Sequence, residues 1–256
     1  MAQDTLEHIA ALIAQADHIV IMTGAGASKE SGIPTFRDAL DGLWSKYEPG
    51  ELATPEAFEK NPALVTQWYD ERRLSALQSK PNAGHIAMAK LQKRLESQGK
   101  KLTLITQNVD ELHQRAGAKD VLELHGSLIT WRGASTGEKQ RNLPEDAFES
   151  YPPKHREGTP QEELLRPDVV WFGEGLPEDA LQEATTQASQ CNLYFSVGTS
   201  SVVWPAAGIV DLAIKAGATT VEVNPTETIL SSEYDHVLRG PSGEIFPKLL
   251  ELAFPD

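Results

Sequence analysis

Cysteine is nearly absent from this chain, because Cys191 is the only one among 256 residues. A single cysteine excludes an internal disulfide and any metal site built from several cysteines. The sequence therefore offers no redox framework.

The chain also lacks long apolar runs. No stretch reaches membrane-spanning length, and residues 1–7 have neither the basic region nor the apolar stretch of a signal peptide. We therefore expect a cytoplasmic location and no membrane partner.

Positive charge is scarce, since 23 Lys and Arg stand against 37 Asp and Glu, for a formal net charge of −14. This balance disfavours nonspecific binding to nucleic acid and favours basic partners, such as lysine-bearing protein segments. We expect no nucleic-acid partner. The oligomeric state stays open, with a monomer among the options.

Strand-like and helix-like segments alternate along most of the chain. Short apolar runs that end in polar residues predict strands at 19–23, 101–106, 121–124, 192–197 and 219–223. The alternation predicts an α/β fold with a doubly wound, Rossmann-like parallel sheet, whose ligands lie at the carboxyl ends of the strands.

Two segments interrupt this alternation. Residues from about 38 to 80 contain an irregular stretch followed by two helices, and residues 127–165 are polar, punctuated by Gly and Pro, and without clear periodicity. We expect a main Rossmann-like domain, 1–126 and 166–256, which carries the helical insertion and a small inserted lobe at 127–165.

The strand at 19–23 ends in Gly24-Ala25-Gly26. Such glycines let the backbone approach a pyrophosphate, whose oxygens the N–H groups of the next helical turn can hold. An ordinary strand-to-helix turn explains them as well, and a dinucleotide fingerprint would need a third glycine where Lys29 stands. The window about 30 residues later, where a dehydrogenase carries a second strand with a ribose-binding acid, contains a loop and helices instead.

Polar groups at other strand ends are further candidates. Asn108 and Asp110 follow the strand at 101–106, where capping of the next helix is the simpler explanation. His125 follows the strand at 121–124, and a structural histidine is commoner there, although a general base also fits. The remaining candidates are Gly198, Thr199, Ser200, Asn224 and Ser242.

The run from Ile19 to Arg37 closely resembles the NAD-binding signature of the sirtuins, the NAD-dependent protein deacylases. Further motifs follow in the family's order, and the resemblance extends to about Gly243. It implies the Rossmann-like fold and NAD as co-substrate. The residues that it assigns to NAD are Gly24, Ala25, Gly26, Ser28, Thr35, Phe36, Arg37, Gln107, Asn108, Asp110, Gly198, Thr199, Ser200, Asn224 and Ser242.

The resemblance also implies a catalytic role for His125, which would deprotonate a ribose hydroxyl after the acyl-lysine amide displaces nicotinamide. Asn108 and Asp110 would hold the nicotinamide carboxamide. The products would be free lysine, nicotinamide and O-acyl-ADP-ribose. A second possibility is another NAD-consuming enzyme, an ADP-ribosyltransferase or NAD hydrolase, and a third is a module that binds NAD without turnover.

Two further motifs concern the acyl-lysine substrate. The segment 169–174 resembles the sirtuin strand that pairs with a substrate peptide and assigns Val170, Phe172 and Gly173 to it, although a plain buried strand fits the pattern too. Tyr69 and Arg72 share a helix face. They could be a half-buried aromatic and a solvated charge, but they resemble the pair that binds the acyl carboxylate in desuccinylating and demalonylating sirtuins.

The chain departs from the family at the small lobe. Sirtuins usually hold a structural zinc there with four cysteines, and residues 127–165 contain none. We expect no metal site and no zinc, so packing, ion pairs or a changed lobe must offset the lost folding free energy.

Overall fold

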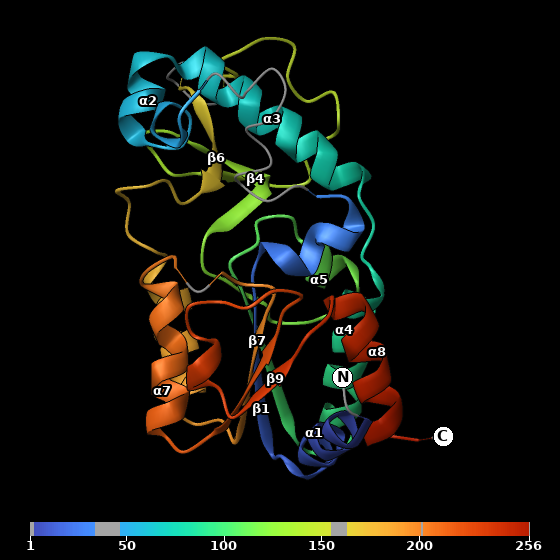
Figure 1. The fold of residues 1–256 in the computed structure, drawn as a ribbon. Helices are drawn as coiled ribbons and strands as arrows, with labels where there is room; N and C mark the ends of the chain where they lie inside the picture. Colours follow the sequence, from blue (N-terminus) through green and yellow to red (C-terminus); the bar gives the residue numbers. More distant parts are fainter. Residues whose placement is uncertain (1–2, 34–46, 155–162, 201, 256) are drawn as a thin grey trace.

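The computed structural model describes residues 3–33, 47–154, 163–200 and 202–255. A six-stranded sheet has the order β3-β2-β1-β7-β8-β9, and all five pairings are parallel. This confirms the predicted doubly wound α/β sheet (Figure 1). Its strands are β1 (His18–Thr23), β2 (Lys101–Thr106), β3 (Leu122–Glu123), β7 (Leu193–Val197), β8 (Thr219–Val223) and β9 (His236–Leu238).

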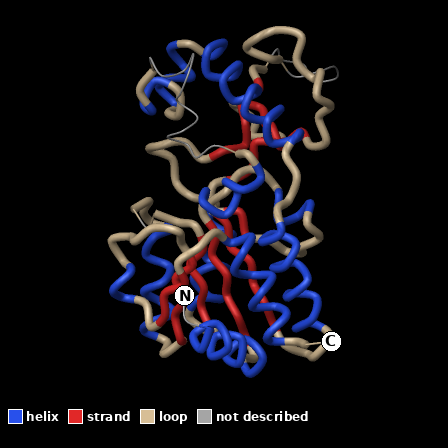
Figure 2. The backbone as a smooth tube through the Cα atoms, turned by 45° about the vertical axis from the view of Figure 1, so that its right-hand side comes forward, coloured by secondary structure: helices blue, strands red, loops and turns tan. Residues whose placement is uncertain are grey.

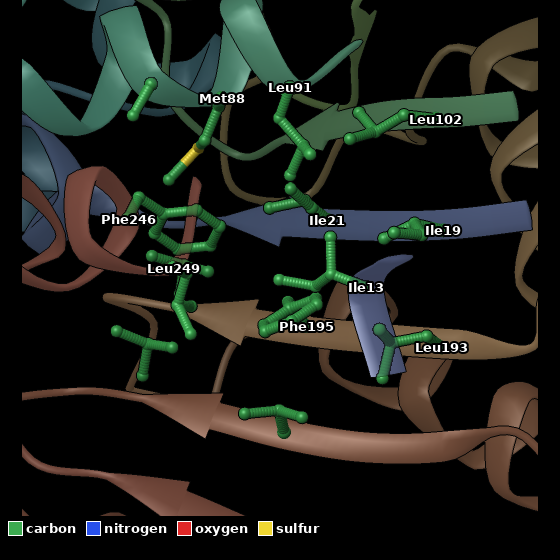
Figure 3. Packing of buried hydrophobic residues seen from close by; sticks show 14 of the residues in the cluster. Ile13, Ile19, Ile21, Met88, Leu91, Leu102, Leu193, Phe195, Phe246 and Leu249 are labelled. Atoms are coloured by element: carbon green, nitrogen blue, oxygen red, sulfur yellow. The ribbon is translucent and has the colours of Figure 1, made fainter. Parts of the chain in front are cut away.

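Helices cover both faces of this sheet. In β1, Ile19 and Ile21 belong to one buried cluster, and Val20 and Met22 belong to another. Side chains alternate between the faces of a strand, so a strand buried on both sides is apolar throughout. Figure 3 shows the first cluster, where Ile21 lies among Met88, Phe195 and Phe246.

The first face is covered by three helices, α1 (Gln3–Gln15), α4 (Ala83–Glu96) and α8 (Ser242–Ala253). The second is covered by α6 (Glu178–Ala188) and α7 (Ile209–Lys215). These two groups flank the sheet in Figure 1. The short 3-10 turn η5 (Ala206–Gly208) leads into α7, and the short α5 (Leu112–Arg115) follows β2.

A second, smaller sheet lies apart from the main one (Figure 2). It is antiparallel, with the order β5-β4-β6, and its strands are β4 (Gly126–Gly133), β5 (Lys139–Gln140) and β6 (Leu165–Val169). Helices α2 (Pro55–Lys60) and α3 (Pro62–Gln78) share one buried cluster with it, in which Trp68, Trp131 and Trp171 are the largest side chains. Helices α2 and α3 and the small sheet therefore build one lobe together.

Two expectations from the sequence concern β6 and the residues that follow it. The expected boundary at 165/166 falls inside β6, all of which pairs with β4. The alternative of a plain buried strand through residue 174 is wrong, because β6 ends at Val169 and a turn follows. The turn has a physical cause, since Gly173 has a φ of 90° and the Glu174 N–H donates to the Trp171 carbonyl.

None of the helices in the described ranges combines the length and the apolarity that a membrane span requires.

Candidate active site

The candidate residues gather where four parallel strands end. Main-chain bonds link these ends, from Gly24 N to Val197 O, from Gln107 N to Thr23 O and from Gly198 N to Val223 O, all at 2.9 Å. The carboxyl ends of β1, β2, β7 and β8 thus form one continuous edge. Open α/β sheets bind their ligands at such an edge.

Gly24 and Gly26 allow two of these loops to touch. A Cβ at Gly26 would lie 2.7 Å from the carbonyl oxygen of Gly198, and one at Gly24 would lie 2.8 Å from the Cα of Thr199. Neither position has room for a side chain. The backbone then enters the short 3-10 helix η1 (Ala25–Ser31), in which Ala25 is exposed and Ser28 is buried.

Ser28, Asn108 and Asp110 form one buried cluster. The Ser28 hydroxyl donates to Asp110 Oδ2 at 2.7 Å, and Asn108 Nδ2 donates to Ser28 Oγ at 3.0 Å. Asn108 Nδ2 also reaches the Gly24 carbonyl at 3.0 Å. The structure therefore brings together residues from two loops that are separated by about 80 positions.

Asp110 also contributes to the start of α5, as the capping alternative proposes. Its Oδ1 accepts from Leu112 N at 2.9 Å, although the residue at the N-cap position itself is Glu111. Burial raises the pKa of Asp110 above its ordinary value, against the hydrogen bonds from Leu112 and Ser28. One carboxylate thus serves both the cap and the cluster.

Two buried histidines adjoin this cluster, and no role for them was expected from the sequence. His85 Nε2 lies 3.5 Å from Ser28 Oγ, and His113 Nε2 lies 2.9 Å from Thr23 Oγ1. Their rings meet edge to face at 4.7 Å. Burial lowers the pKa of His85 to about 4 and that of His113 to about 3, so both rings are neutral at neutral pH.

His125 lies at the same edge, just after β3. Its Nδ1 is 3.0 Å from the carbonyl oxygen of Gln107. A carbonyl only accepts, so Nδ1 carries the proton of the neutral ring and Nε2 keeps a lone pair. Burial lowers the pKa of His125 below 6.5, against the Gln107 hydrogen bond. The ring is therefore a neutral base with a fixed tautomer.

The other strand ends are connected to each other. Asn224 Nδ2 donates to the Thr199 carbonyl at 2.9 Å, and Gln107 Nε2 donates to Thr199 Oγ1 at 3.3 Å. Ser200 is exposed. Ser242 begins α8 and is 4% exposed, and its Oγ has no hydrogen-bond partner within the described residues. Thr35, Phe36 and Arg37 lie outside the described residues.

The pair on α3 is packed rather than solvated. Tyr69 is 1% exposed, and the Arg72 guanidinium carbon lies 4.6 Å from the Trp68 ring centroid and 5.6 Å from that of Tyr69. Burial raises the pKa of Tyr69 to about 12, and nearby Arg72 opposes this rise, so the phenol stays protonated. The alternative of a half-buried aromatic and a solvated charge does not describe this stacked pair.

The turn after β6 adjoins the candidate base. Val170 N donates to the carbonyl of His125 at 3.0 Å, and Phe172 N donates to the carbonyl of Ala53 at 2.9 Å. Phe172 is 54% exposed. The three residues expected to meet a peptide, Val170, Phe172 and Gly173, therefore lie on a surface turn that is bonded to the loop of His125.

In the small lobe, a carboxylate organises the loop after β4. Glu163 Oε1 accepts from Ser135 N at 2.6 Å, from Ser135 Oγ at 2.7 Å and from Thr136 N at 2.7 Å, and Oε2 accepts from Thr136 Oγ1 at 2.8 Å. Within the described residues, no three His, Cys, Asp or Glu side chains gather as a metal site.

Comparison with known proteins identifies the family. The model described as the Sir2 family matches residues 24–205. This chain belongs to the Sir2 family. It is 50% identical over 250 residues to "NAD-dependent protein deacylase 1" of Pseudomonas aeruginosa, with 95% of this chain and 97% of that protein covered. It is 41% identical over 260 residues to "NAD-dependent protein deacylase sirtuin-5, mitochondrial" of Canis lupus familiaris, covering 93% and 83%.

Solved Sir2 structures share the fold. A Sir2 homologue in complex with NAD is 42% identical, with a TM-score of 0.86 and coverage of 96% of this chain and 93% of that one. A structure titled "Sir2-p53 peptide-NAD+" is 32% identical, with a TM-score of 0.82 and coverage of 96% and 97%. The family likeness therefore spans both the main sheet and the small lobe of this Sir2 chain.

Proposed function

We propose that this chain is an NAD-dependent protein-lysine deacylase that removes succinyl and malonyl groups as well as acetyl groups, and that releases nicotinamide and O-acyl-ADP-ribose. The observation that carries the proposal is the position of His125, a neutral base that the Gln107 carbonyl holds at the same carboxyl edge of the sheet as the buried polar cluster of Ser28, Asn108 and Asp110. The names of the relatives, which are NAD-dependent protein deacylases, support it.

NAD fits this edge as a co-substrate. Gly24 and Gly26 have no room for a side chain, so the loops of Gly24 and Gly198 meet backbone to backbone at the edge where open α/β sheets bind their ligands. Ser242 Oγ has no hydrogen-bond partner within the described residues, which leaves a buried hydroxyl for an adenosine contact. Solved Sir2 complexes with NAD support this assignment. NAD supplies an electrophilic ribose carbon, and the chain's own residues supply position and a base.

The side chains divide this work. Asn108 and Asp110 are placed to hold the nicotinamide carboxamide, because Ser28 fixes both of them through hydrogen bonds. An amide is a poor nucleophile, so the acyl-lysine oxygen must be held in line with the bond that breaks. His125 then accepts a proton from a ribose hydroxyl at Nε2 while Gln107 holds its other nitrogen.

Tyr69 and Arg72 carry the proposed preference for acidic acyl groups. A guanidinium binds a carboxylate with two parallel hydrogen bonds, and a protonated phenol donates a third. The Trp68 ring holds Arg72 from one side by stacking. Acetyl-lysine lacks the carboxylate, so it gains nothing from this pair and depends on the rest of the site.

The remaining parts of the proposal concern partners and metal. The substrates are acylated proteins or peptides, and we expect no nucleic-acid or membrane partner and a cytoplasmic location. We also expect no structural zinc, since residues 127–165 contain no cysteine. The oligomeric state stays open.

Arg72→Met tests the activity and the acyl preference together. Wild-type protein with NAD is expected to remove succinyl and acetyl groups from lysine peptides. The variant should lose about 10- to 100-fold in kcat/KM for desuccinylation, the worth of a charge-assisted bidentate pair, and keep deacetylation within about threefold. Peptide turnover followed by chromatography measures both rates.

Arg94→Met is the matched control, because Arg94 is an exposed arginine of α4 that stacks on Phe254 at 5.4 Å. It should leave both rates unchanged. An unaltered ratio of desuccinylation to deacetylation in Arg72→Met would show that the assignment of Tyr69 and Arg72 is wrong. Absence of acyl removal by the wild type would overturn the proposed function itself.

A further inference from the structure

Arg166 of β6 makes an ion pair that the expected site does not include. Arg166 is 7% exposed. Its Nη1 donates to Glu174 Oε1 at 2.6 Å, and its Nη2 donates to Glu174 Oε2 at 2.9 Å. Two parallel bonds between a planar guanidinium and a planar carboxylate fix orientation as well as distance. The pair therefore sets the position of Glu174 relative to β6.

The same guanidinium stacks on Trp171. Its central carbon lies 3.3 Å from the ring centroid, and Nη2 also donates to the Val169 carbonyl at 3.1 Å. The Trp171 ring is 2% exposed and lies 6.1 Å from the ring of Tyr69. Arg166 is thus linked through one aromatic ring to the tyrosine of the expected acyl-binding pair.

Glu174 closes the turn that follows β6. Its Oε2 accepts from Trp171 N at 2.8 Å, and its own N–H donates to the Trp171 carbonyl at 3.0 Å. Gly173 supplies the positive φ of 90° that the turn needs. The main-chain bond and the side-chain bond therefore close the same four-residue turn, 171–174. We call this turn, together with the ion pair of Glu174 and Arg166, the bracket; its buried end is the Arg166 guanidinium.

The bracketed turn presents the groups expected to meet the substrate. Val170 and Phe172 are held from outside by main-chain bonds to His125 and Ala53, at 3.0 and 2.9 Å. A rotation of the turn would break the bond to the loop of the candidate base. It would also displace Phe172, which is exposed beside Gly173.

We propose that Arg166 and Glu174 are positioning residues for the acyl-lysine substrate, which hold the turn at 170–174 against His125 and fix Trp171 beside Tyr69. This inference deepens the proposed function and rests on it. A peptide that pairs by main-chain bonds gains affinity when the receiving edge is already ordered, because no loop entropy is lost on binding. Loss of the bracket therefore weakens peptide binding and leaves NAD binding intact.

If the ion pair had a purely structural role, its loss would have a different effect. It would lower the thermal stability of the lobe without changing the KM of either substrate, because KM does not depend on the fraction of enzyme that is folded. The relevant comparison is the KM for the peptide against the KM for NAD in the same preparation.

The test uses Glu174→Gln and Arg166→Lys in the full chain, with a succinyl-lysine peptide and NAD as substrates. Glu174→Gln replaces one acceptor oxygen with an amino group, and Arg166→Lys keeps the charge but removes the fork. Each should raise the peptide KM about tenfold, the loss of one charge-assisted bond geometry, and keep the KM for NAD within about twofold.

Glu163→Gln is the matched control, because Glu163 is a hydrogen-bonded carboxylate of the same lobe that holds residues 135 and 136 instead of the substrate turn. It should lower the melting temperature and leave the peptide KM unchanged. An unchanged peptide KM in both test variants, or an equal rise of the two KM values, would overturn the inference. Absence of turnover by the wild type would instead count against the proposed function.

Discussion

At the scale of single residues, His125 is prepared for base catalysis by what surrounds it. The Gln107 carbonyl 3.0 Å from Nδ1 determines the tautomer, and burial holds the pKa below 6.5. The sequence placed His125 after a strand but could not give its tautomer, because the carbonyl that decides it lies 18 residues earlier. Secondary structure alone could not distinguish a structural histidine from a base.

The lowered pKa of His125 predicts the acid limb of the pH profile. The neutral ring is the active form, so the acid-side half-maximal point of kcat/KM for deacylation should lie below pH 6.5, the ordinary pKa of a histidine. Initial rates in buffers of constant ionic strength measure the profile. A half-maximal point above pH 7 would mean that the folded protein raises the pKa of this histidine.

At the scale of elements, the small lobe is held to α3 by buried polar groups. Arg73 is 0% exposed and donates to Asp70 Oδ1 at 2.6 Å and to the carbonyls of Pro144 and Glu145 at 3.0 and 2.9 Å. Tyr151 donates to the other Asp70 oxygen at 2.5 Å. One guanidinium therefore ties the helix to a loop about 70 residues away.

Arg73→Met should destabilise the protein strongly, because it leaves the Asp70 carboxylate buried without its cation. We expect a loss of about 3–5 kcal/mol in the free energy of unfolding. Chemical denaturation followed by tryptophan fluorescence reports on this lobe, whose core contains Trp68, Trp131 and Trp171.

The exposed Arg94→Met provides the comparison for this substitution, with an expected cost below about 1 kcal/mol. Equal losses for the two variants would show that the Arg73 network does not anchor the lobe.

At the scale of the whole molecule, sequence periodicity predicted the doubly wound sheet and five of its six strands, but it missed the short edge strand β9 (His236–Leu238). Apolar strands that end in polar residues predict helices on both faces, whereas the strand order and the contact of Ser28 with Asn108 are known only from the structure. The small lobe could not be predicted in the same way. Its arrangement depends on hydrogen bonds such as those that residues 135 and 136 donate to Glu163, and no local sequence pattern predicts them.

The same limit explains two other differences. The turn after β6 depends on Arg166, eight residues before its partner Glu174, and on the main chain of His125 and Ala53. The packing of α3 against the small sheet depends on aromatic side chains from segments that lie far apart in the chain. Distant contacts, more than propensity, decide these regions.

Mass spectrometry of the complete reaction tests the central claim most directly. Wild-type protein is incubated with NAD and either a succinyl-lysine or an acetyl-lysine peptide, and every product is identified. The account predicts that each deacylated peptide is matched by one nicotinamide and one O-acyl-ADP-ribose. Consumption of NAD to free ADP-ribose or to an ADP-ribosylated protein, with the acyl peptide intact, would contradict it.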